Sequence, residues 1–100
     1  TPIDTGQYTG SGNASITIDS SAGGFMVWCQ ADRANASTHT GTWSGSGIIT
    51  TDKELVVASG SRSGSVGSVK PTTNVTNGTF TLTGGAGSDQ NKVVIASWSA

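Results

Sequence analysis

The stretch Gly24-Phe25-Met26-Val27-Trp28-Cys29-Gln30-Ala31 decides the fold, because it is the densest run of large apolar side chains in the sequence. Turn-forming residues flank it, at positions 20–23 before it and 32–35 after it. A short apolar run between such flanks predicts a β-strand buried on both faces, and its Phe, Val and Trp residues favour a strand over a helical turn. Its expected partner is the apolar run 92–98, near the end of the chain.

Alternating apolar and polar residues predict further strands on either side of this stretch. In residues 14–19 the alternation turns Ile16 and Ile18 toward a core, and in residues 79–83 it turns Phe80 and Leu82 the same way. Residues 47–51 and 54–59 predict a hairpin that turns at Asp52-Lys53, and Asn77-Gly78 predicts a turn before the strand 79–83.

The composition favours a small all-β domain. Ser, Thr and Gly fill 45 of the 100 positions, while Leu, Ile, Val and Phe fill only 18, so the core must be small. No segment shows apolar residues at helical spacing over more than two turns. These features predict a small antiparallel β-sandwich or a barrel-like pair of sheets. Residues 1–100 are interpreted as a single β-sandwich domain, and an origin as the C-terminal fragment of a longer fibre protein stays open.

The same composition limits how such a domain is stabilised. Cys29 is the only cysteine, so no disulfide can form within the chain, and its place in an apolar run predicts a buried, inert thiol. With so thin a core, self-association becomes the expected source of additional burial. The five Lys and Arg residues are scattered along the sequence and predict no nucleic-acid partner. No apolar stretch approaches the about 20 residues of a membrane-spanning helix, so no membrane insertion is expected.

No arrangement of residues predicts catalysis. The triplet Asp4-Thr5-Gly6 matches that of aspartic proteases, but no apolar strand precedes it to support the catalytic loop. His39 is the only histidine, and no Gly-x-Ser-x-Gly turn presents a nucleophile near it. One His and one Cys cannot make a Cys/His zinc site. We therefore expect a protein that is not an enzyme and that needs no metal and no cofactor.

Binding is the function that the polar residues 32–47 could support. Trp43 lies among Thr, Ser and Gly there, and an exposed aromatic ring can stack on the apolar face of a sugar. Arg33, Asn35 and His39 could bond to the sugar hydroxyls, so these four residues are the candidate ligand-binding set. The alternative is that Trp43 folds back over the core. Four Asn-x-Ser/Thr sequons also occur, and whether any is glycosylated stays open.

The segment Gln7-Tyr8-Thr9-Gly10-Ser11-Gly12-Asn13-Ala14-Ser15-Ile16-Thr17-Ile18 resembles a short β domain of bacteriophage tail-fibre and related structural proteins. That domain continues with an apolar strand, here residues 25–29, and closes with an apolar strand ending in Trp, here residues 93–98. The resemblance implies a virion component located outside the cell. It also implies a homo-oligomer, with a trimer favoured, whose loops bind a glycan or protein receptor on the host surface.

Three functions are therefore carried forward from the sequence. The first is a non-enzymatic tail-fibre domain that acts in host attachment and in fibre assembly. The second is a secreted carbohydrate-binding module, which glycan binding by a monomer would favour. The third is a purely structural part of a capsid or fibre, which would bind its own particle but no host glycan.

Overall fold

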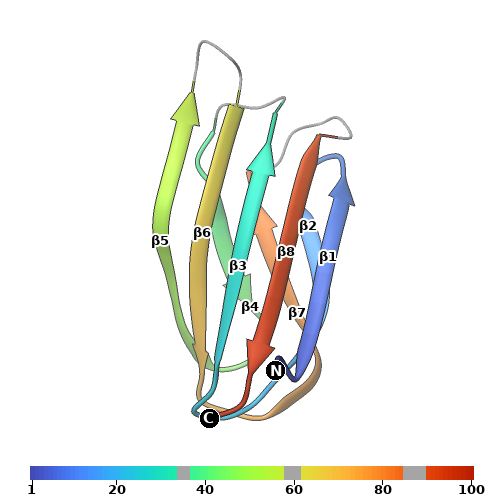
Figure 1. Ribbon diagram of the computed structural model, residues 1–100, viewed down its shortest axis with the longest axis vertical. Helices are drawn as coiled ribbons and strands as arrows, with labels where there is room; N and C mark the ends of the chain where they lie inside the picture. The colour runs from blue at the N-terminus through green and yellow to red at the C-terminus, as the bar shows by residue number, and fades with distance from the viewer. Residues whose placement is uncertain (34–36, 58–61, 85–89) are drawn as a thin grey trace.

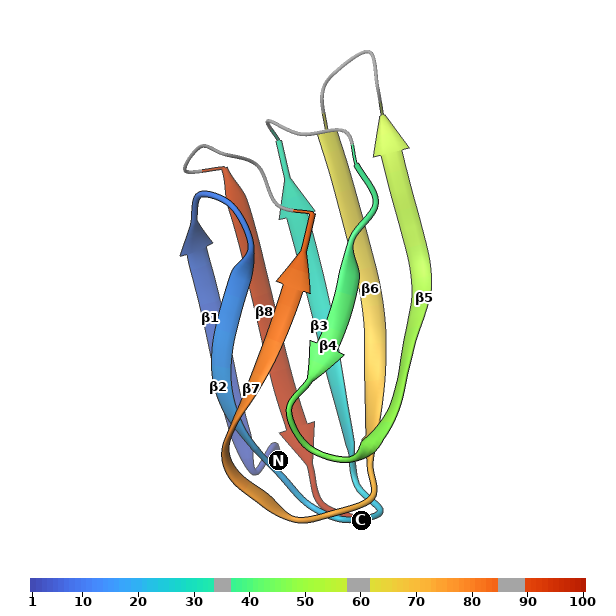
Figure 2. The same ribbon diagram turned by 180° about the vertical axis from the view of Figure 1, so that it is seen from behind.

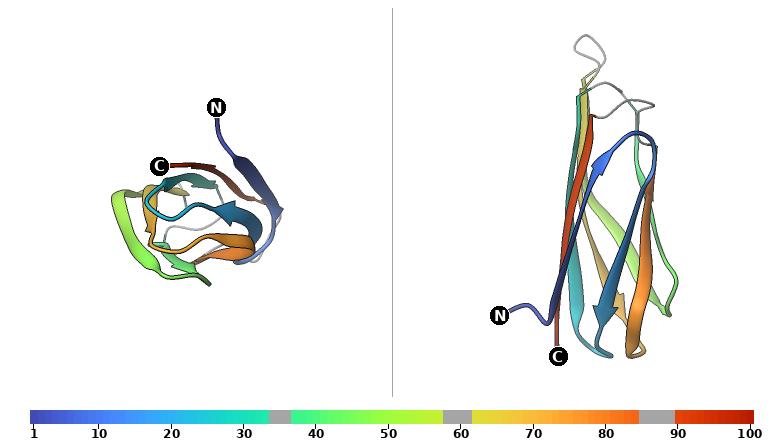
Figure 3. Two further views of the ribbon diagram at one scale, coloured as in Figure 1. Left: turned by 90° about the horizontal axis from the view of Figure 1, so that it is seen from below. Right: turned by 90° about the vertical axis from the view of Figure 1, so that its right-hand side faces the viewer.

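Eight β-strands form two antiparallel sheets in the computed structural model, which describes residues 1–33, 37–57, 62–84 and 90–100 (Figure 1). The all-β sandwich expected from the sequence is confirmed, and Figure 3 shows its two layers edge-on. The strands are β1 (Asp4–Gly10), β2 (Ala14–Ser20), β3 (Phe25–Asp32), β4 (Thr40–Trp43), β5 (Gly47–Val57), β6 (Arg62–Pro71), β7 (Val75–Thr83) and β8 (Asn91–Trp98).

The strand order is that of a jelly roll, apart from the position of β5. The larger sheet has the order β1-β8-β3-β6-β5 and the smaller has the order β2-β7-β4 (Figures 1 and 2). The pairs β1–β8, β2–β7 and β3–β6 are nested inside one another along the sequence, as expected when a long hairpin wraps around a barrel axis. The innermost pair expected in this series, β4–β5, is not formed, because β5 pairs with β6 in the larger sheet and not with β4.

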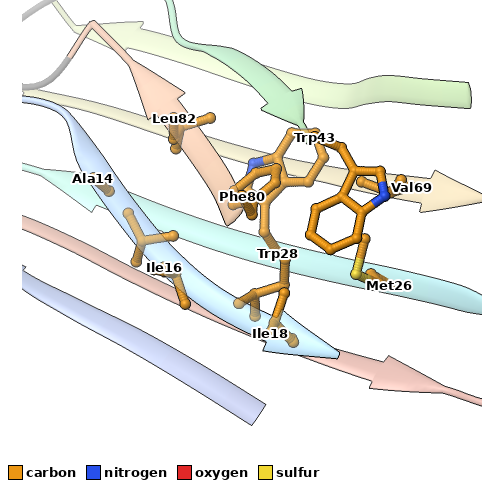
Figure 4. Packing of buried hydrophobic residues seen from close by; sticks show 11 residues of the cluster. Ala14, Ile16, Ile18, Met26, Trp28, Trp43, Val69, Phe80 and Leu82 are labelled. Carbon is orange, nitrogen blue, oxygen red and sulfur yellow. The ribbon is translucent and has the colours of Figure 1, made fainter. Parts of the chain in front are cut away.

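The core lies between the two sheets and is built around aromatic rings. Trp28 of β3 and Phe80 of β7 face each other with ring centroids 5.0 Å apart, and Met26, Ile18 and Leu82 are fully buried around them (Figure 4). The indole of Trp28 fits because β6 carries Gly67 opposite it, where a Cβ atom would come within 2.1 Å of the ring. The inward positions predicted for Ile16, Ile18, Phe80 and Leu82 are confirmed.

The expected pairing of the two apolar runs is confirmed, and two predicted turns are wrong. β3 pairs with β8 over its full length. The predicted hairpin at Asp52-Lys53 is instead one continuous strand, β5, in which Asp52 is an extra residue that forms a bulge. The bulge takes up the turn-forming residues without reversing the chain, and it places charged side chains on the edge of the sheet.

The predicted turn at Asn77-Gly78 lies inside β7 and is also a bulge. Asp19 of β2 faces two residues there, Thr76 and Asn77, and Asn77 has a φ angle of 54°. The backbone N–H of Asn77 donates a 2.7 Å hydrogen bond to Asp19 Oδ1, which stabilises the left-handed conformation. The backbone preference of Asn-Gly is therefore realised, but inside a strand and not between two strands.

The prediction that β3 is buried on both faces is wrong for this chain. Its side chains alternate between the core and the surface, so Met26 and Trp28 are buried while Phe25 and Cys29 are exposed. The thiol of Cys29, expected to be buried, therefore lies on the surface. The physical reason is that only one sheet covers β3, whereas burial of both faces requires a third layer.

Candidate functional site

Polar side chains occupy one end of the sandwich interior, where β3 ends and where β6 and β8 begin. We call this the loop end, and it is the upper end in Figure 1. Gln30 and Asn91 are buried there, at 6% and 0% exposure. Gln30 Nε2 donates a 2.9 Å hydrogen bond to Asn91 Oδ1, and Asn91 Nδ2 donates one of the same length to the carbonyl oxygen of Gly12. Ser65 Oγ donates to Gln30 Oε1 at 3.3 Å, so this amide is bonded through both its oxygen and its nitrogen.

His39 joins this buried network and takes a defined tautomer in it. Its Nδ1 lies 3.3 Å from Glu54 Oε1, and its Nε2 lies 3.1 Å from Gln30 Nε2. Because the amide nitrogen of Gln30 can only donate, His39 Nε2 is the acceptor and the proton is on Nδ1, facing Glu54. The backbone N–H of His39 also donates to Glu54 Oε1, at 2.7 Å.

The network holds the strand ends of the loop end in place. It also encloses the His39 side chain, so a substrate cannot reach the imidazole. Hydrogen bonds join β3, β6 and β8 to the segment before β4 and to β5, so the strand ends are held in one arrangement. The His39 side chain has no exposed surface. A general base must reach the proton that it removes, and this imidazole is enclosed by Gln30 and Glu54.

A small pocket lies on the surface beside this network and carries most of the chain's positive charge. Its volume is about 220 Å³, and Arg33, Arg62 and Lys92 are among the residues that line it. These are three of the five Lys and Arg residues of the chain, which are scattered in the sequence but gather in space. Asp32, 2% exposed, also lines the pocket. We call this the cationic pocket.

The other notable surface is the outer face of the five-stranded sheet, the side that looks away from the core. Cross-strand partners put apolar side chains next to one another there, with Phe25 opposite Trp98 and Val94 opposite Cys29. The exposed fractions reach 44% for Phe25 and 54% for Val94. We call this surface the apolar face; it consists of Phe25, Val27, Cys29, Leu55, Val66, Val94, Ala96 and Trp98.

The apolar face contains an open hollow and one stacked aromatic pair. The hollow has a volume of about 670 Å³ and lies over β1, β3 and β8, where Thr5 and Gln7 are its polar margin. The rings of Phe25 and Trp98 stack with centroids 4.9 Å apart and planes 13° apart. Cys29 lines the same hollow.

The structure does not bring the four predicted ligand-binding residues together. Trp43 lies on β4, inside the segment that was expected to be a loop, and its side chain is 9% exposed among the core residues. His39 is buried in the polar network, so both residues point into the sandwich. Arg33 is exposed and lines the cationic pocket, and Asn35 lies outside the described residues. The alternative prediction, that Trp43 packs over the core, is the one that the structure supports.

Sequence reasoning missed Arg62 and Lys92 as partners of Arg33. Each of the three lies within two residues of a strand terminus, where β3 ends or where β6 and β8 begin. Consecutive antiparallel strands reverse direction, so counting strands would have put these three termini at one end of the sandwich. The wrong hairpin at Asp52-Lys53 adds one strand and the unpredicted β4 removes one, so the predicted number of strands between Arg33 and Arg62 was already correct and contained this signal.

Neither a metal centre nor a spanning helix is found in the part of the chain that the structure describes. Over residues 1–33, 37–57, 62–84 and 90–100, no three His, Cys, Asp or Glu side chains are grouped as metal ligands. No helix within these ranges is long and apolar enough to cross a membrane. Comparisons with protein-family models, with curated proteins and with solved structures give no match for this chain.

Proposed function

We propose that this chain is a non-enzymatic domain of a bacteriophage tail fibre, which acts in fibre assembly and in attachment to the host surface. In this proposal copies of the chain associate through the apolar face, three to a fibre, and each copy presents its loop end to the host. The jelly-roll fold is compatible with such a role, since viral capsid proteins and lectins use it. Because one fold serves many functions, the proposal depends on the surfaces and not on the fold.

The observation that carries the proposal is that β3 is apolar on both faces while the chain covers only one. The inward residues Met26 and Trp28 meet the smaller sheet, whereas the outward residues Phe25, Val27 and Cys29 meet solvent. A strand with this pattern is typical of a sheet buried on both sides. Contiguous exposed apolar surface of this kind marks an interaction site, and a second copy of the chain provides a matching apolar surface.

The size of the apolar face suits such an interface. β3 has 8 residues and the apolar face spans four of the five strands, so it measures about 26 Å by about 19 Å, a flat area on the order of 500 Å². Specific interfaces bury about 800 Å² of accessible surface per partner, and side chains raise the accessible area above the flat area. Charged residues lie at the margins of the face, with Arg62 and Lys92 at the loop end and Lys70 at the other end. An apolar centre with a charged rim is the usual anatomy of an interface.

The test is the mass of the chain in solution, measured by light scattering after size exclusion over a range of concentrations. We expect an assembled species of three times the 10.0 kDa chain mass, which dissociates on dilution. A chain that stays at 10.0 kDa at every concentration would contradict the proposal. Binding of the assembled protein to host cells then separates an attachment domain from a purely structural fibre part.

A secreted carbohydrate-binding module is the second candidate, and the stacked pair of Phe25 and Trp98 favours it. A sugar ring can stack on an exposed aromatic ring while Thr5 and Gln7, at the margin of the same hollow, bond to its hydroxyls. This function predicts a monomer that binds neutral oligosaccharides, and it predicts that Trp98→Ala abolishes that binding. The aliphatic residues Val27, Val94 and Ala96 that fill the rest of the hollow favour a protein partner instead.

A further inference from the structure

We propose that the cationic pocket binds the anionic group of an acidic sugar, whether that group is a carboxylate, a sulfate or a phosphate. This inference rests on the proposed role of the chain in host attachment, and it names the ligand class at the loop end. Its basis is the meeting of Arg33, Arg62 and Lys92 around one pocket of about 220 Å³, in a chain whose overall net charge is −1.

The backbone register explains how three distant cations come to line one pocket. Ala31 of β3 lies opposite Lys92 of β8 on one side and opposite Gly64 of β6 on the other. Because Ala31 and Gly64 are small, the larger side chains around them enclose a hollow instead of filling it. Arg62 comes from the same end of β6, and Arg33 follows directly after β3. The buried network at Gln30 and Asn91 holds these strand ends in place from below.

The donors of the pocket suit an anion with several oxygen atoms. Arg33 Nε donates a hydrogen bond to Gln90 Oε1, which orients the guanidinium group and leaves its two terminal nitrogens with four N–H donors. Two arginines in one pocket can each make paired hydrogen bonds to a carboxylate, sulfate or phosphate. The carboxylate of Asp32 offsets one of the three positive charges of the lining, so the pocket has a net charge of two positive units.

The other lining residues favour a sugar over a nucleic acid. Gln90 lines the pocket and its amide nitrogen can donate to a hydroxyl group, whereas none of the described lining residues is aromatic. Recognition of a single-stranded nucleic acid depends on bases stacked on aromatic side chains. The volume is also below the 300–1,000 Å³ that is usual for drug-sized ligands, so it suits one charged sugar unit at the end of a glycan.

The pocket remains accessible when the apolar face is covered. It lies at the loop end, beyond the Cys29–Val94 pair, and Lys92 and Arg62 belong to the charged margin of that face. Assembly through the centre of the face would leave this margin at the rim. The pocket and the interface can therefore be tested separately in the same full-length chain.

The experiment is calorimetric titration of the full chain with three acidic probes and one neutral probe. The acidic probes are 3′-sialyllactose, a sulfated lactose and glucose 6-phosphate, which distinguish the three anionic groups, and lactose is the neutral probe. We expect at least one acidic probe to bind at least tenfold more tightly than lactose. We also expect K92Q and R33Q each to weaken that binding by about tenfold or more, as for loss of a hydrogen bond to a charged group.

Lys70→Gln is the matched control, because Lys70 is exposed on the same face of the same sheet but at its opposite end. It changes the net charge as K92Q does and should leave binding unchanged. Equal weakening by both variants, or no preference for the acidic probes, would overturn the inference. Light scattering of the same samples separates the two proposals. An assembled protein that does not bind acidic sugars would contradict the ligand proposed for the pocket and leave the proposed assembly standing. A monomer that binds them would contradict the proposed assembly and leave the ligand standing.

Discussion

The two outer faces of the sandwich follow the same alternating strand pattern, but one carries hydroxyl side chains and the other carries apolar side chains. On the three-stranded sheet, the outward positions are hydroxyl residues, which we call the threonine face: Ser15, Thr17, Thr40, Thr42, Thr79, Thr81 and Thr83. On the five-stranded sheet, the outward positions of β3 and β8 are Phe, Val, Cys, Ala and Trp over most of their length. β-Branched Thr retains strand propensity and is compatible with water, so a hydrated face needs no apolar residue.

The difference shows that the apolar face does not arise from a general shortage of polar residues. Ser and Thr fill 30 of the 100 positions, yet along β3 every outward position from Phe25 to Ala31 lacks a hydroxyl. In the proposed assembly the two faces therefore have different surroundings. The threonine face is suited to solvent, and the apolar face is suited to a partner.

The largest expected effect comes from placing a charge on each face in turn. Val94→Lys puts an ammonium group at the centre of the apolar face, where assembly would bury it without a partner. We expect self-association to weaken by on the order of 100-fold or more, since an unpaired buried charge costs several kcal/mol. Thr79→Lys, at an exposed position on the threonine face, is the matched control and should leave the mass by light scattering unchanged. If both variants weakened self-association equally, the apolar face would not be the interface.

A second comparison tests the inner and outer faces of one strand, β6. Gly67→Ala would place a Cβ atom 2.1 Å from the Trp28 ring and 2.5 Å from the carbonyl oxygen of Thr50. We expect it to lower the free energy of unfolding by about 3 kcal/mol, because the core is already filled. Gly64→Ala points to the outer face, where the nearest atom is the Gln30 carbonyl oxygen at 3.2 Å, and should cost less than half as much. Urea unfolding of both variants measures the difference, and similar midpoints would argue against the inner packing described above.

Cys29 offers a probe of the apolar face without any substitution. Its thiol is exposed in the single chain and lies among residues that assembly would cover. We expect a maleimide to label it at least about tenfold more slowly at concentrations where the chain is assembled than after dilution to the monomer, because local opening must precede reaction. Val94→Lys should label rapidly at every concentration. If the labelling rate of the native chain did not depend on protein concentration, the interface would not include Cys29.

The smallest expected effect concerns a polar group on the inner face of the larger sheet. Ser97 Oγ is fully buried and has no hydrogen-bond partner among the described residues. Ser97→Ala removes this group, so we expect thermal unfolding to show a gain of up to about 1 kcal/mol. Ser65→Ala is the contrasting variant, because Ser65 Oγ donates to Gln30 and accepts from Trp28 Nε1. It should destabilise by about 1–3 kcal/mol, and a loss of similar size for both would contradict the assignment of Ser97 as unpartnered.

Much of the fold could be predicted from local patterns, whereas the candidate sites could not. The alternation around Ile16, Ile18, Phe80 and Leu82 specified which side chains face the core, and the apolar runs at 24–31 and 92–98 specified the central pair. The turns failed where β-bulges replaced them, because Asp-Lys and Asn-Gly are compatible with both local structures. The predicted site failed with Trp43 and His39, because their polar sequence neighbours concealed that alternate residues face inward on β4 and at the residue just before it.

The sequence by itself determined an all-β protein with a small core, one cysteine and a strand that is apolar on both sides. These properties follow from side-chain volume, strand propensity and the two-residue period of a strand, all of which are local. Only the tertiary structure decided that one face of that strand is left uncovered, that His39 lies in a buried hydrogen-bond network, and that Arg33, Arg62 and Lys92 share a pocket. Such juxtapositions depend on register and on sheet order, which are set by packing between segments far apart in the chain.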